Sequence, residues 1–358
     1  MATLTETAYY TRQGIKYGSI GLVGILVLWF VGTGVISWWK ATHPTPLPPP
    51  KMEFGRIADI TFPESSVSVS AYDLQTPTGK LGKFPDRMLV LSAPSKRSGF
   101  LDADRAIDLA SRLGFLFTPT QPSETLYRWT QSDPLPATLD VDIVSGHFIL
   151  KRQWQADPSL VVSKRFVSEQ QTVMDAQGFL RGVSLLPADL NGPKKVSFWR
   201  AQGDRLVETI SLSEADFVEV DMFRSNYQIV GEDKEVLAEY GFFTPDPEEG
   251  IVSVLLSGAS DIKQKQIVEV RYNHTEVNYT LTGEYPIKTV ETAWEELKNG
   301  GGYIASLKGD KAVVRRIELG YYDSGGEQEY MMPIYVFTGD NDLVAYVSAI
   351  RGDVIKTE

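Results

Sequence analysis

The side chains that most often carry enzyme chemistry are sparse in this chain and do not gather along the sequence. The three histidines are His43, His147 and His274, and none belongs to a His-Glu-x-x-His pattern. Because these histidines lie far apart in the sequence, their spacing argues against a histidine metal site. Cysteine is absent, which excludes disulfides, zinc thiolate sites, iron–sulfur clusters and cysteine nucleophiles.

One tetrad has the spacing of a catalytic motif. Ser260 and Lys263 fit the Ser-x-x-Lys pattern of penicillin-recognising enzymes. That chemistry needs the serine at the start of a helix, so that the lysine one turn on can accept its proton. Here the tetrad lies in a polar connection between two expected strands, and the sequence holds no Ser-Asp-Asn or Lys-Thr-Gly partner. A chance match is therefore the favoured interpretation.

Carboxylates are abundant, but their spacing does not single out a reaction. Calcium needs about six to eight oxygen ligands, and Asp and Asn favour turns for backbone reasons alone. Among 46 acidic residues, pairs suited to glycoside hydrolysis are always available, so none is preferred. We expect no metal, no cofactor and no catalytic residue. The acidic patterns considered are the turn Asp340-Asn341-Asp342 and the strand-face pairs Asp140–Asp142 and Glu219–Asp221.

The segments that would position functional residues begin with a short N-terminal tail, residues 1–17. An apolar, uncharged segment follows at residues 18–39. Crossing a bilayer takes about 20 apolar residues. The segment is longer than the roughly 7–15 residues of a signal-peptide core, and Trp38, Trp39 and Lys40 follow in place of a small-x-small cleavage site. We therefore expect an uncleaved transmembrane helix, with a cleaved signal peptide as the alternative.

The orientation of this helix is only weakly encoded by charge. Arg12 and Lys16 flank one end while Lys40 and Lys51 flank the other, so the positive-inside count is nearly balanced. A short leading tail and a long trailing body favour a cytoplasmic N-terminus. We expect a single-pass protein of the plasma membrane with an extracytoplasmic body.

Four glycines fall on one stripe of the apolar helix, which is a pattern that lets a second helix approach closely. The alternative is that glycine is simply common in membrane helices. The predicted packing face comprises Gly14, Gly18, Gly21 and Gly32.

A proline-rich linker, residues 40–56, follows the anchor. Residues 44–50 contain five prolines, a composition that favours an extended polyproline II spacer of about 20 Å. We interpret it as a stalk for the body, with a ligand for a proline-reading domain as the alternative.

The body shows a recurring order in which a short amphipathic helix and a glycine precede β-rich segments, which predicts an α+β fold. Asp102 is a candidate N-cap of the first helix, Gly178 and Gly182 interrupt the second, and Thr289 caps the third. We expect two or three modules, each a curled antiparallel sheet over one helix, at residues 57–155, 156–245 and 246–358. The expected helices are 102–113, 168–186 and 289–298; the expected strands are 125–131, 139–150, 195–200, 205–212, 313–321, 330–337 and 343–350.

Two details sharpen this expectation. Residues 195–200 and 205–212 flank the turn Gln202-Gly203-Asp204, which predicts a hairpin. Pro333 inside an expected strand implies an edge position or a bulge, because proline cannot donate to the ladder.

A set of runs in the last unit carries a resemblance to a known family: residues 285–300, 317–322, 332–337 and 345–349, and more loosely 102–107 with 113–114 in the first unit. On these runs the last unit resembles the PepSY-like modules of the YycH/YycI family, and the overall layout resembles uncharacterised membrane-anchored proteins of candidate-phyla bacteria. The resemblance implies sheet-on-helix folds in single-pass, extracytoplasmic regulators of partner proteins. The matching positions are apolar residues and turn glycines, so no catalytic residue is carried over.

Charge and resemblance together favour a protein that works by binding. The formal net charge is −11, and Arg12, Lys16 and Lys40 against Glu6 give the first 40 residues +2, which leaves −13 for the rest. Such a body repels nucleic acid and anionic lipid headgroups. We expect a non-catalytic regulator or scaffold, held in the bilayer by its helix, that binds an envelope protein or a second copy of itself. The alternatives are an envelope hydrolase with dispersed carboxylates and a structural cell-surface protein.

The candidate interface is an exposed sheet edge rich in tyrosine. Tyrosine suits interfaces because its ring packs while its hydroxyl stays in water, although tyrosines on strands also occur in cores. The predicted interface residues are Tyr321, Tyr322, Tyr330 and Tyr335.

Overall fold

A computed structural model describes residues 4–42, 48–65, 67–94, 99–162, 166–258 and 266–356. The chain forms two compact units, residues 1–49 and 50–358. Ser260 and Lys263 of the Ser-x-x-Lys tetrad, His43 and the first two of the five linker prolines lie outside the described residues.

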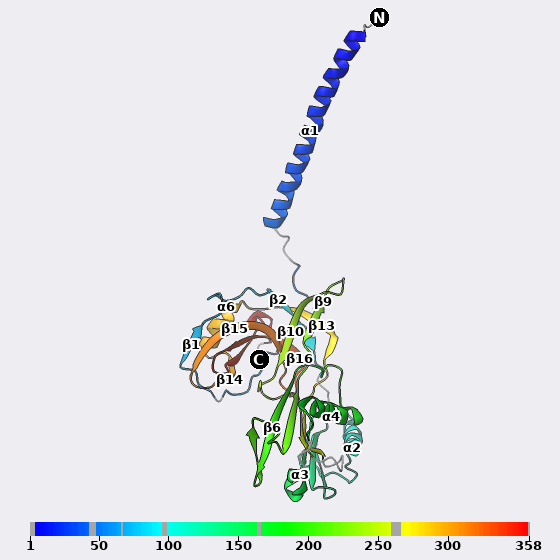
Figure 1. Ribbon diagram of the computed structural model, residues 1–358, viewed down its shortest axis with the longest axis vertical. Helices are drawn as coiled ribbons and strands as arrows, with labels where there is room; N and C mark the ends of the chain where they lie inside the picture. Colours follow the sequence, from blue (N-terminus) through cyan, green and yellow to red (C-terminus); the bar gives the residue numbers. More distant parts are fainter. Residues whose placement is uncertain are drawn as a thin grey trace. The chain divides into compact units, whose positions relative to one another are not determined.

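The first unit is the single helix α1 (Leu4–Thr42), shown in blue in Figure 1. Residues 12–39 of α1 are long and apolar enough to cross a membrane. The helix begins at Leu4, ahead of the predicted transmembrane segment 18–39, because the polar residues before the apolar segment contain no proline and continue it. It ends at Thr42, inside the predicted linker 40–56.

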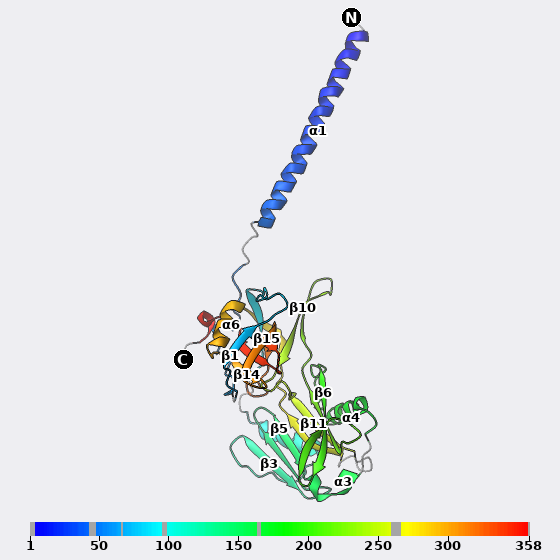
Figure 2. The same ribbon diagram turned by 60° about the vertical axis from the view of Figure 1, so that its left-hand side comes forward.

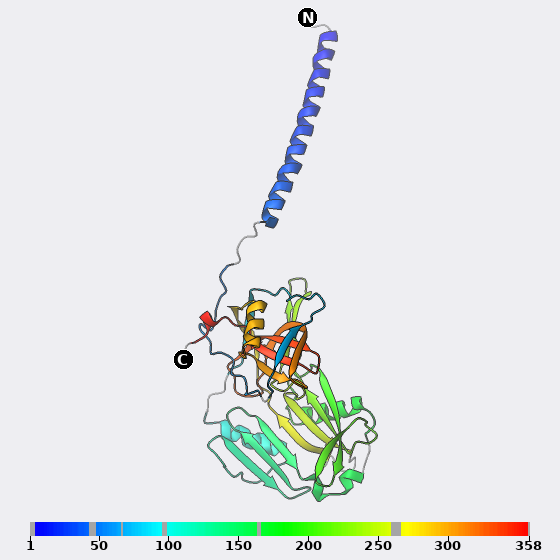
Figure 3. The same cartoon turned by 90° about the vertical axis from the view of Figure 1, so that its left-hand side faces the viewer.

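The second unit contains two large sheets, which are shown apart most clearly in Figure 3. The nine-stranded sheet has the order β13-β2-β16-β15-β10-β9, with β1 beside β15, β17 beside β16 and β14 beside β17. Its pairs are antiparallel except β1·β15 and β10·β15, which are parallel. Its strands are β1 (Ala71–Leu74), β2 (Arg87–Ser92), β9 (Tyr227–Val230), β10 (Val236–Phe243), β13 (Asn278–Pro286), β14 (Tyr303–Ser306), β15 (Lys311–Tyr322), β16 (Tyr330–Gly339) and β17 (Val344–Ser348).

The eight-stranded sheet is antiparallel throughout, in the order β3-β4-β5-β12-β11-β8-β6-β7. Figure 2 shows it with α3 and α4 beside its strands. Its strands are β3 (Leu126–Gln131), β4 (Ala137–Asp142), β5 (Phe148–Arg152), β6 (Lys194–Gln202), β7 (Arg205–Thr209), β8 (Phe217–Met222), β11 (Val252–Ser257) and β12 (Ile267–Tyr272).

The predicted modules 57–155, 156–245 and 246–358 do not correspond to separate sheets. Strands β1 and β2 of the first module pair with β13, β15 and β16 of the third, whereas β3, β4 and β5 join the other sheet. The chain passes between the two sheets after β2, β8, β10 and β12. We call the two parts the nine-strand lobe and the eight-strand lobe. The general expectation of an α+β body built mostly of sheet is confirmed.

The predicted helices are present, and their ends have local causes. Thr289 caps α6 (Val290–Lys298), where its hydroxyl accepts a hydrogen bond from the Thr292 N–H at 3.3 Å. Ser168 caps α4 (Glu169–Gly182) in the same way. Helix α4 stops before the predicted residue 186 because Ser184 adopts a φ of +57°. Helix α2 (Asp102–Arg112) begins at its predicted cap, and Leu101 takes the cap position instead.

Each lobe has its own apolar core. Helix α6 packs on the nine-stranded sheet through Trp294 and Leu297. Helices α2 and α4 cover one face of the eight-stranded sheet, around Trp129 and Phe148. The other face of that sheet buries Trp154 near η1 (Trp154–Ala156) and α3 (Ser159–Val162). The short η2 (Gly352–Val354) closes the described chain.

Two strand predictions need correction. The expected strand 139–150 is the hairpin β4–β5, because the Asp142 carboxylate accepts hydrogen bonds from the N–H groups of Val144 and Ser145 and folds the chain into a turn. Pro333 lies neither at an edge nor in a bulge: it pairs with Tyr321 of β15, and its carbonyl accepts from Ala349 on the other side. Its missing N–H falls where β16 changes neighbour from β2 to β17, so no ladder bond is lost.

Candidate functional site

The predicted tyrosine interface is wrong in its central residues. Tyr321 and Tyr335 are each 0% exposed and Tyr322 is 4% exposed. These side chains are buried because β15 and β16 lie inside the sheet rather than at its edge. The Tyr321 hydroxyl donates to the Leu89 carbonyl at 2.9 Å, a core contact. Only Tyr330 is half-buried, and its ring lies 4.8 Å from that of Phe54.

The glycine stripe of α1 stays a prediction. At Gly14, Gly18, Gly21 and Gly32, an added Cβ would meet no other atom of the chain within 4 Å. The stripe is therefore uncovered, and nothing in the structure shows what packs on it.

Carboxylates of the acidic patterns form ion pairs with lysine and arginine side chains. Asp340 pairs with Arg315 at 2.7 Å, Asp342 with Lys308 at 2.7 Å, and Asp140 with Arg128 at 2.6 Å. Among the described residues, no three His, Cys, Asp or Glu side chains are grouped so as to hold a metal ion. These carboxylates serve turns and strand pairs. His147 lies in the β4–β5 hairpin, with Nε2 3.2 Å from Thr275 Oγ1.

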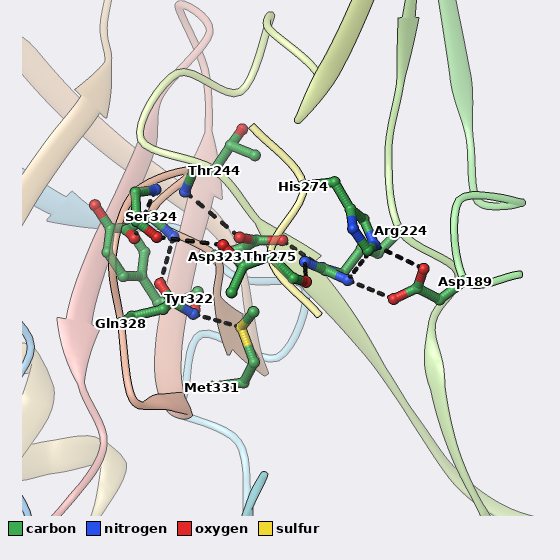
Figure 4. Close-up of polar contacts among 12 residues, drawn as sticks. Asp189, Arg224, Thr244, His274, Thr275, Tyr322, Asp323, Ser324, Gln328 and Met331 are labelled. Carbon is green, nitrogen blue, oxygen red and sulfur yellow. Dashed lines mark hydrogen bonds and ion pairs between the residues drawn. The ribbon is translucent and has the colours of Figure 1, made fainter. Parts of the chain in front are cut away.

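A buried charged cluster lies where the two lobes meet, and its centre is Arg224 (Figure 4). Arg224 follows β8 and its side chain is 0% exposed. Its Nε donates to Asp323 Oδ2 at 2.5 Å, and Asp323 directly follows β15 of the other sheet. Its Nη1 donates to Asp189, in the loop after α4. Its Nη2 donates to the carbonyl of Thr275, in the segment that joins β12 to β13.

Two further side chains complete the cluster around Asp189. His274 Nε2 lies 2.8 Å from Asp189 Oδ1 and 3.0 Å from Arg224 Nη1. The Tyr279 hydroxyl donates to Asp189 Oδ2 at 2.9 Å. Every polar edge of the guanidinium therefore has a partner, as a buried charge requires. The Arg224 cluster, comprising Asp189, Arg224, His274, Tyr279 and Asp323, is the main charged connection described between the lobes.

Electrostatics within the cluster favour the charged forms of Asp189 and Arg224 and the neutral form of Tyr279. Burial raises the pKa of Asp189, but the hydrogen bond from His274 and the charges of His274 and Arg224 outweigh it, so the net pKa is lowered. Burial lowers the pKa of Arg224, but the charges of Asp323 and Asp189 raise it by more, so the net pKa is raised. Burial and the Asp189 charge raise the pKa of Tyr279, which keeps its hydroxyl protonated as a donor. The arrangement is suited to holding two lobes in register.

The backbone beside the cluster leaves no room for a side chain at Gly192. A Cβ at Gly192 would lie 1.9 Å from the Arg224 carbonyl oxygen. We expect Gly192→Ala to lower the free energy of unfolding by roughly 1–3 kcal/mol, because the backbone segments at Gly192, before β6, and at Arg224, after β8, would have to move apart. Gly178→Ala in α4 is the matched control: its Cβ meets nothing within 4 Å, and it is expected to raise stability by about 0.5–1 kcal/mol. Urea unfolding of both variants checks this, and equal effects would contradict the close approach.

An acidic cavity of about 380 Å³ adjoins the Arg224 cluster. It lies between residues 58–61 and the loop 323–329 that joins β15 to β16. Asp323 of this loop binds Arg224, whereas Glu327 and Glu329 line the cavity, together with Asp59 from the other side. The loop therefore connects the lobe junction to the cavity. Figure 4 shows Ser324, Gln328 and Tyr322 beside the cluster.

Two larger cavities have lining groups that already pair with one another. One, of about 540 Å³, is lined by Phe242, Phe243 and the ion pair Arg316–Glu318. The other, of about 750 Å³, lies at the N-terminus of α6, where Arg87 pairs with Asp86 and Arg351 with Asp353.

Sequence reasoning did not find the Arg224 cluster or the acidic cavity. The cluster joins Asp189 to Asp323 through Arg224, and these residues lie far apart along the chain. The cavity acids Glu327 and Glu329 sit in a glycine-containing loop, which by itself predicts only a turn. No local signal marks either site.

Comparison with known proteins adds little to this description. No protein-family model and no curated protein matches the chain. Four solved chains match, among them an uncharacterised protein from Eubacterium rectale with 12% sequence identity. That match covers 76% of this chain and 86% of the other, with a TM-score of 0.32. At this TM-score the likeness carries no conclusion about fold or function.

Proposed function

We propose that this chain is a single-pass membrane protein whose acidic body works by binding outside the cytoplasm, as a regulator or scaffold for an envelope partner. The observation that carries the proposal is the exposure of α1. Its apolar side chains face outward on all sides; Ile25 is 69% exposed, Leu28 73% and Phe30 71%. A helix of this kind is stable in water only if something covers it, and a bilayer does so over its whole circumference.

Binding is preferred over catalysis because of where the perturbed carboxyl lies. Burial, followed by the nearby Glu219 charge, raises the pKa of Asp221 to about 6. A raised carboxyl pKa is typical of general acids, but Asp221 is 3% exposed and lines none of the cavities described above. The perturbation is accounted for by burial within the eight-stranded sheet. The lobes locked by the Arg224 cluster offer a rigid surface for a partner.

The anchor is tested by placing charge in the middle of α1. We expect the double variant Ile25→Arg and Leu28→Arg to leave the membrane fraction, because each arginine at a helix centre costs about 2.5–3.5 kcal/mol of insertion free energy. Tyr9→Arg, ahead of the apolar segment, is the matched control and should stay in the membrane. Fractionation without detergent measures the result. A wild-type chain found in the soluble fraction would refute the anchor.

Topology and binding are tested on the same protein. Protease added to intact cells should degrade the body, and crosslinking in native membranes followed by mass spectrometry should recover a reproducible protein partner or a second copy. A protected body would overturn the orientation. Recovery of neither partner nor dimer would overturn the binding role.

A further inference from the structure

We propose that Asn278 is the attachment site of an N-linked oligosaccharide. The sequence contains two acceptor patterns of the type Asn-x-Thr without a central proline, at residues 273–275 and 278–280. The inference rests on the extracytoplasmic body of the proposed function, because N-linked sugars are attached to chains that are delivered across a membrane. The structure separates the two patterns and selects the second.

The second pattern points its two functional side chains to solvent. It lies at the start of β13, the first strand in the order of the nine-stranded sheet (Figure 1). Side chains along a strand point alternately to opposite faces. Asn278 and Thr280 are exposed, whereas Tyr279 between them is half-buried and its hydroxyl donates to Asp189 at 2.9 Å. Tyr279 therefore anchors the segment in the Arg224 cluster and leaves both acceptor residues on the outside.

The Asn278 amide is oriented by neighbouring donors. Its Oδ1 accepts hydrogen bonds from the N–H groups of Thr280 and Leu281, each at 3.1 Å, and from the Thr280 hydroxyl at 2.8 Å. Because N–H groups can only donate, the atom that they meet is the amide oxygen. Within the described part of the chain, no hydrogen bond engages Asn278 Nδ2. The nitrogen that carries the sugar is therefore unpaired on an exposed residue.

The backbone beside Asn278 leaves room for a bulky group. Strand β13 pairs with β2 at Asn278 opposite Ser92, and the next pair is Thr282 opposite Leu91, so the register shifts between them. Leu281 in this irregular segment is 45% exposed. Irregularities of this kind re-aim side chains at sheet edges. A sugar on Asn278 therefore does not have to fit inside the sheet.

The first pattern is engaged in the lobe junction. Asn273 is half-buried, and its N–H donates to the Ile251 carbonyl at 2.8 Å. The Thr275 carbonyl accepts from Arg224 Nη2, and the Thr275 hydroxyl lies 3.2 Å from His147 Nε2. A bulky group at Asn273 would have to displace these contacts. The same three-residue spacing therefore gives one accessible acceptor and one internal control.

The order of synthesis makes Asn278 reachable before folding is complete. Residues 278–280 precede β14, β15, β16 and β17, all of which belong to the same sheet. The asparagine therefore emerges while that sheet still lacks strands. Since Asn278 stays exposed afterwards, the folded protein accommodates the product as well.

The reaction requires a lipid-linked oligosaccharide diphosphate as the sugar donor and a transferase that supplies a base. Asn278 Nδ2 bonds to the anomeric carbon of the sugar while the bond from that carbon to the diphosphate oxygen breaks. The diphosphate leaves with the electron pair, one amide proton passes to the base, and nothing is oxidised or reduced. The attached sugar is bulky and solubilising, and it would shield the outer edge of β13 from pairing with other chains.

Mass spectrometry of the full-length protein, purified in detergent from the membranes of its own cells, tests the proposal. We expect an intact mass above that of the sequence, and peptide fragmentation should place the added sugar on Asn278 and leave Asn273 unmodified. Absence of sugar from Asn278 would overturn the proposal. Equal modification of Asn273 would overturn the structural selection between the two patterns.

Variants separate the acceptor pattern from other sources of added mass. Asn278→Gln and Thr280→Ala should each lose the sugar, whereas Thr280→Ser keeps the hydroxyl and should retain it. Asn273→Gln is the matched control and should retain the whole mass excess. Thermal unfolding checks that each variant is folded. Sugar that persists in Thr280→Ala, which leaves the asparagine in place, would show that the pattern is not what directs the modification.

Protease treatment of intact cells keeps this inference distinct from the proposed function. A degraded body with an unmodified Asn278 would overturn the sugar site and leave the orientation standing. A protected body with an unmodified Asn278 would overturn both.

Discussion

Replacing Arg224 by methionine is expected to lower the free energy of unfolding by roughly 3–5 kcal/mol. Methionine keeps much of the side-chain volume but removes the charge. The Asp323 side chain, 1% exposed, would then lack its cation, and Asp189, 15% exposed, would keep only its contacts with His274 and Tyr279. The Thr275 carbonyl would also lose its donor. The cost comes from uncompensated buried charge, which water cannot reach to solvate.

The matched control for this variant is Arg316→Met. Arg316 pairs with Glu318, but its side chain is 70% exposed, so we expect a loss below about 1 kcal/mol. Adding Asp323→Asn to Arg224→Met should recover part of the loss, because it removes the stranded charge. Urea unfolding of the full-length protein, followed by tryptophan fluorescence, measures all three. Similar losses for Arg224→Met and Arg316→Met would contradict the description of the Arg224 cluster.

Asp221→Asn is expected to stabilise the protein at pH 8 by on the order of 3 kcal/mol and to have much less effect at pH 4. Burial, followed by Glu219, raises the Asp221 pKa from 3.8 to about 6 in the folded state. Below the unfolded-state pKa, the Asp221 carboxyl is neutral in both states and the wild-type protein keeps its full stability. As the pH rises through the folded-state pKa, the buried carboxyl ionises and the wild-type folded state loses stability.

Asparagine suits this position because it is neutral at every pH and keeps an oxygen for the Gly250 N–H, which now donates to Asp221 Oδ1 at 3.1 Å. The comparison is the difference in unfolding free energy between variant and wild type, taken from urea unfolding at pH 4, 6 and 8. Asp204→Asn, on the exposed β6–β7 turn, should change little at any of these values. A variant effect independent of pH would show that Asp221 does not carry the raised pKa.

Features governed by neighbouring residues could be predicted from the sequence. The Thr289 cap of α6, the Ser168 cap region of α4 and the β6–β7 hairpin each depend on groups a few residues apart. The apolar helix α1 is similarly local. In each case the hydrogen bonds that determine the structure join residues only a few positions apart, so the sequence of one segment is enough to predict it.

Features that depend on distant pairing could not be predicted. Tyr321 and Tyr335 alternate on strands like surface residues, and only the neighbours β2, β10 and β17 make them core. The Arg224 cluster likewise needs four segments that meet only after both sheets have formed. In the sequence, single acidic or basic residues in such segments cannot be distinguished from solvated surface charges, because the sequence does not show which of them will form ion pairs in the folded protein.

The repeated passage of the chain between its two sheets imposes an order on assembly. Strands β1, β2 and β10 emerge before partners that lie in the C-terminal part of the chain: β15 for β1 and β10, and β13 and β16 for β2. The eight-stranded sheet has all its strands once residue 272 has been made, whereas the nine-stranded sheet lacks a strand until β17 has been synthesised. A nascent chain therefore carries unpaired strand edges through most of its synthesis. A premature stop near residue 300 would abolish one lobe entirely instead of shortening it.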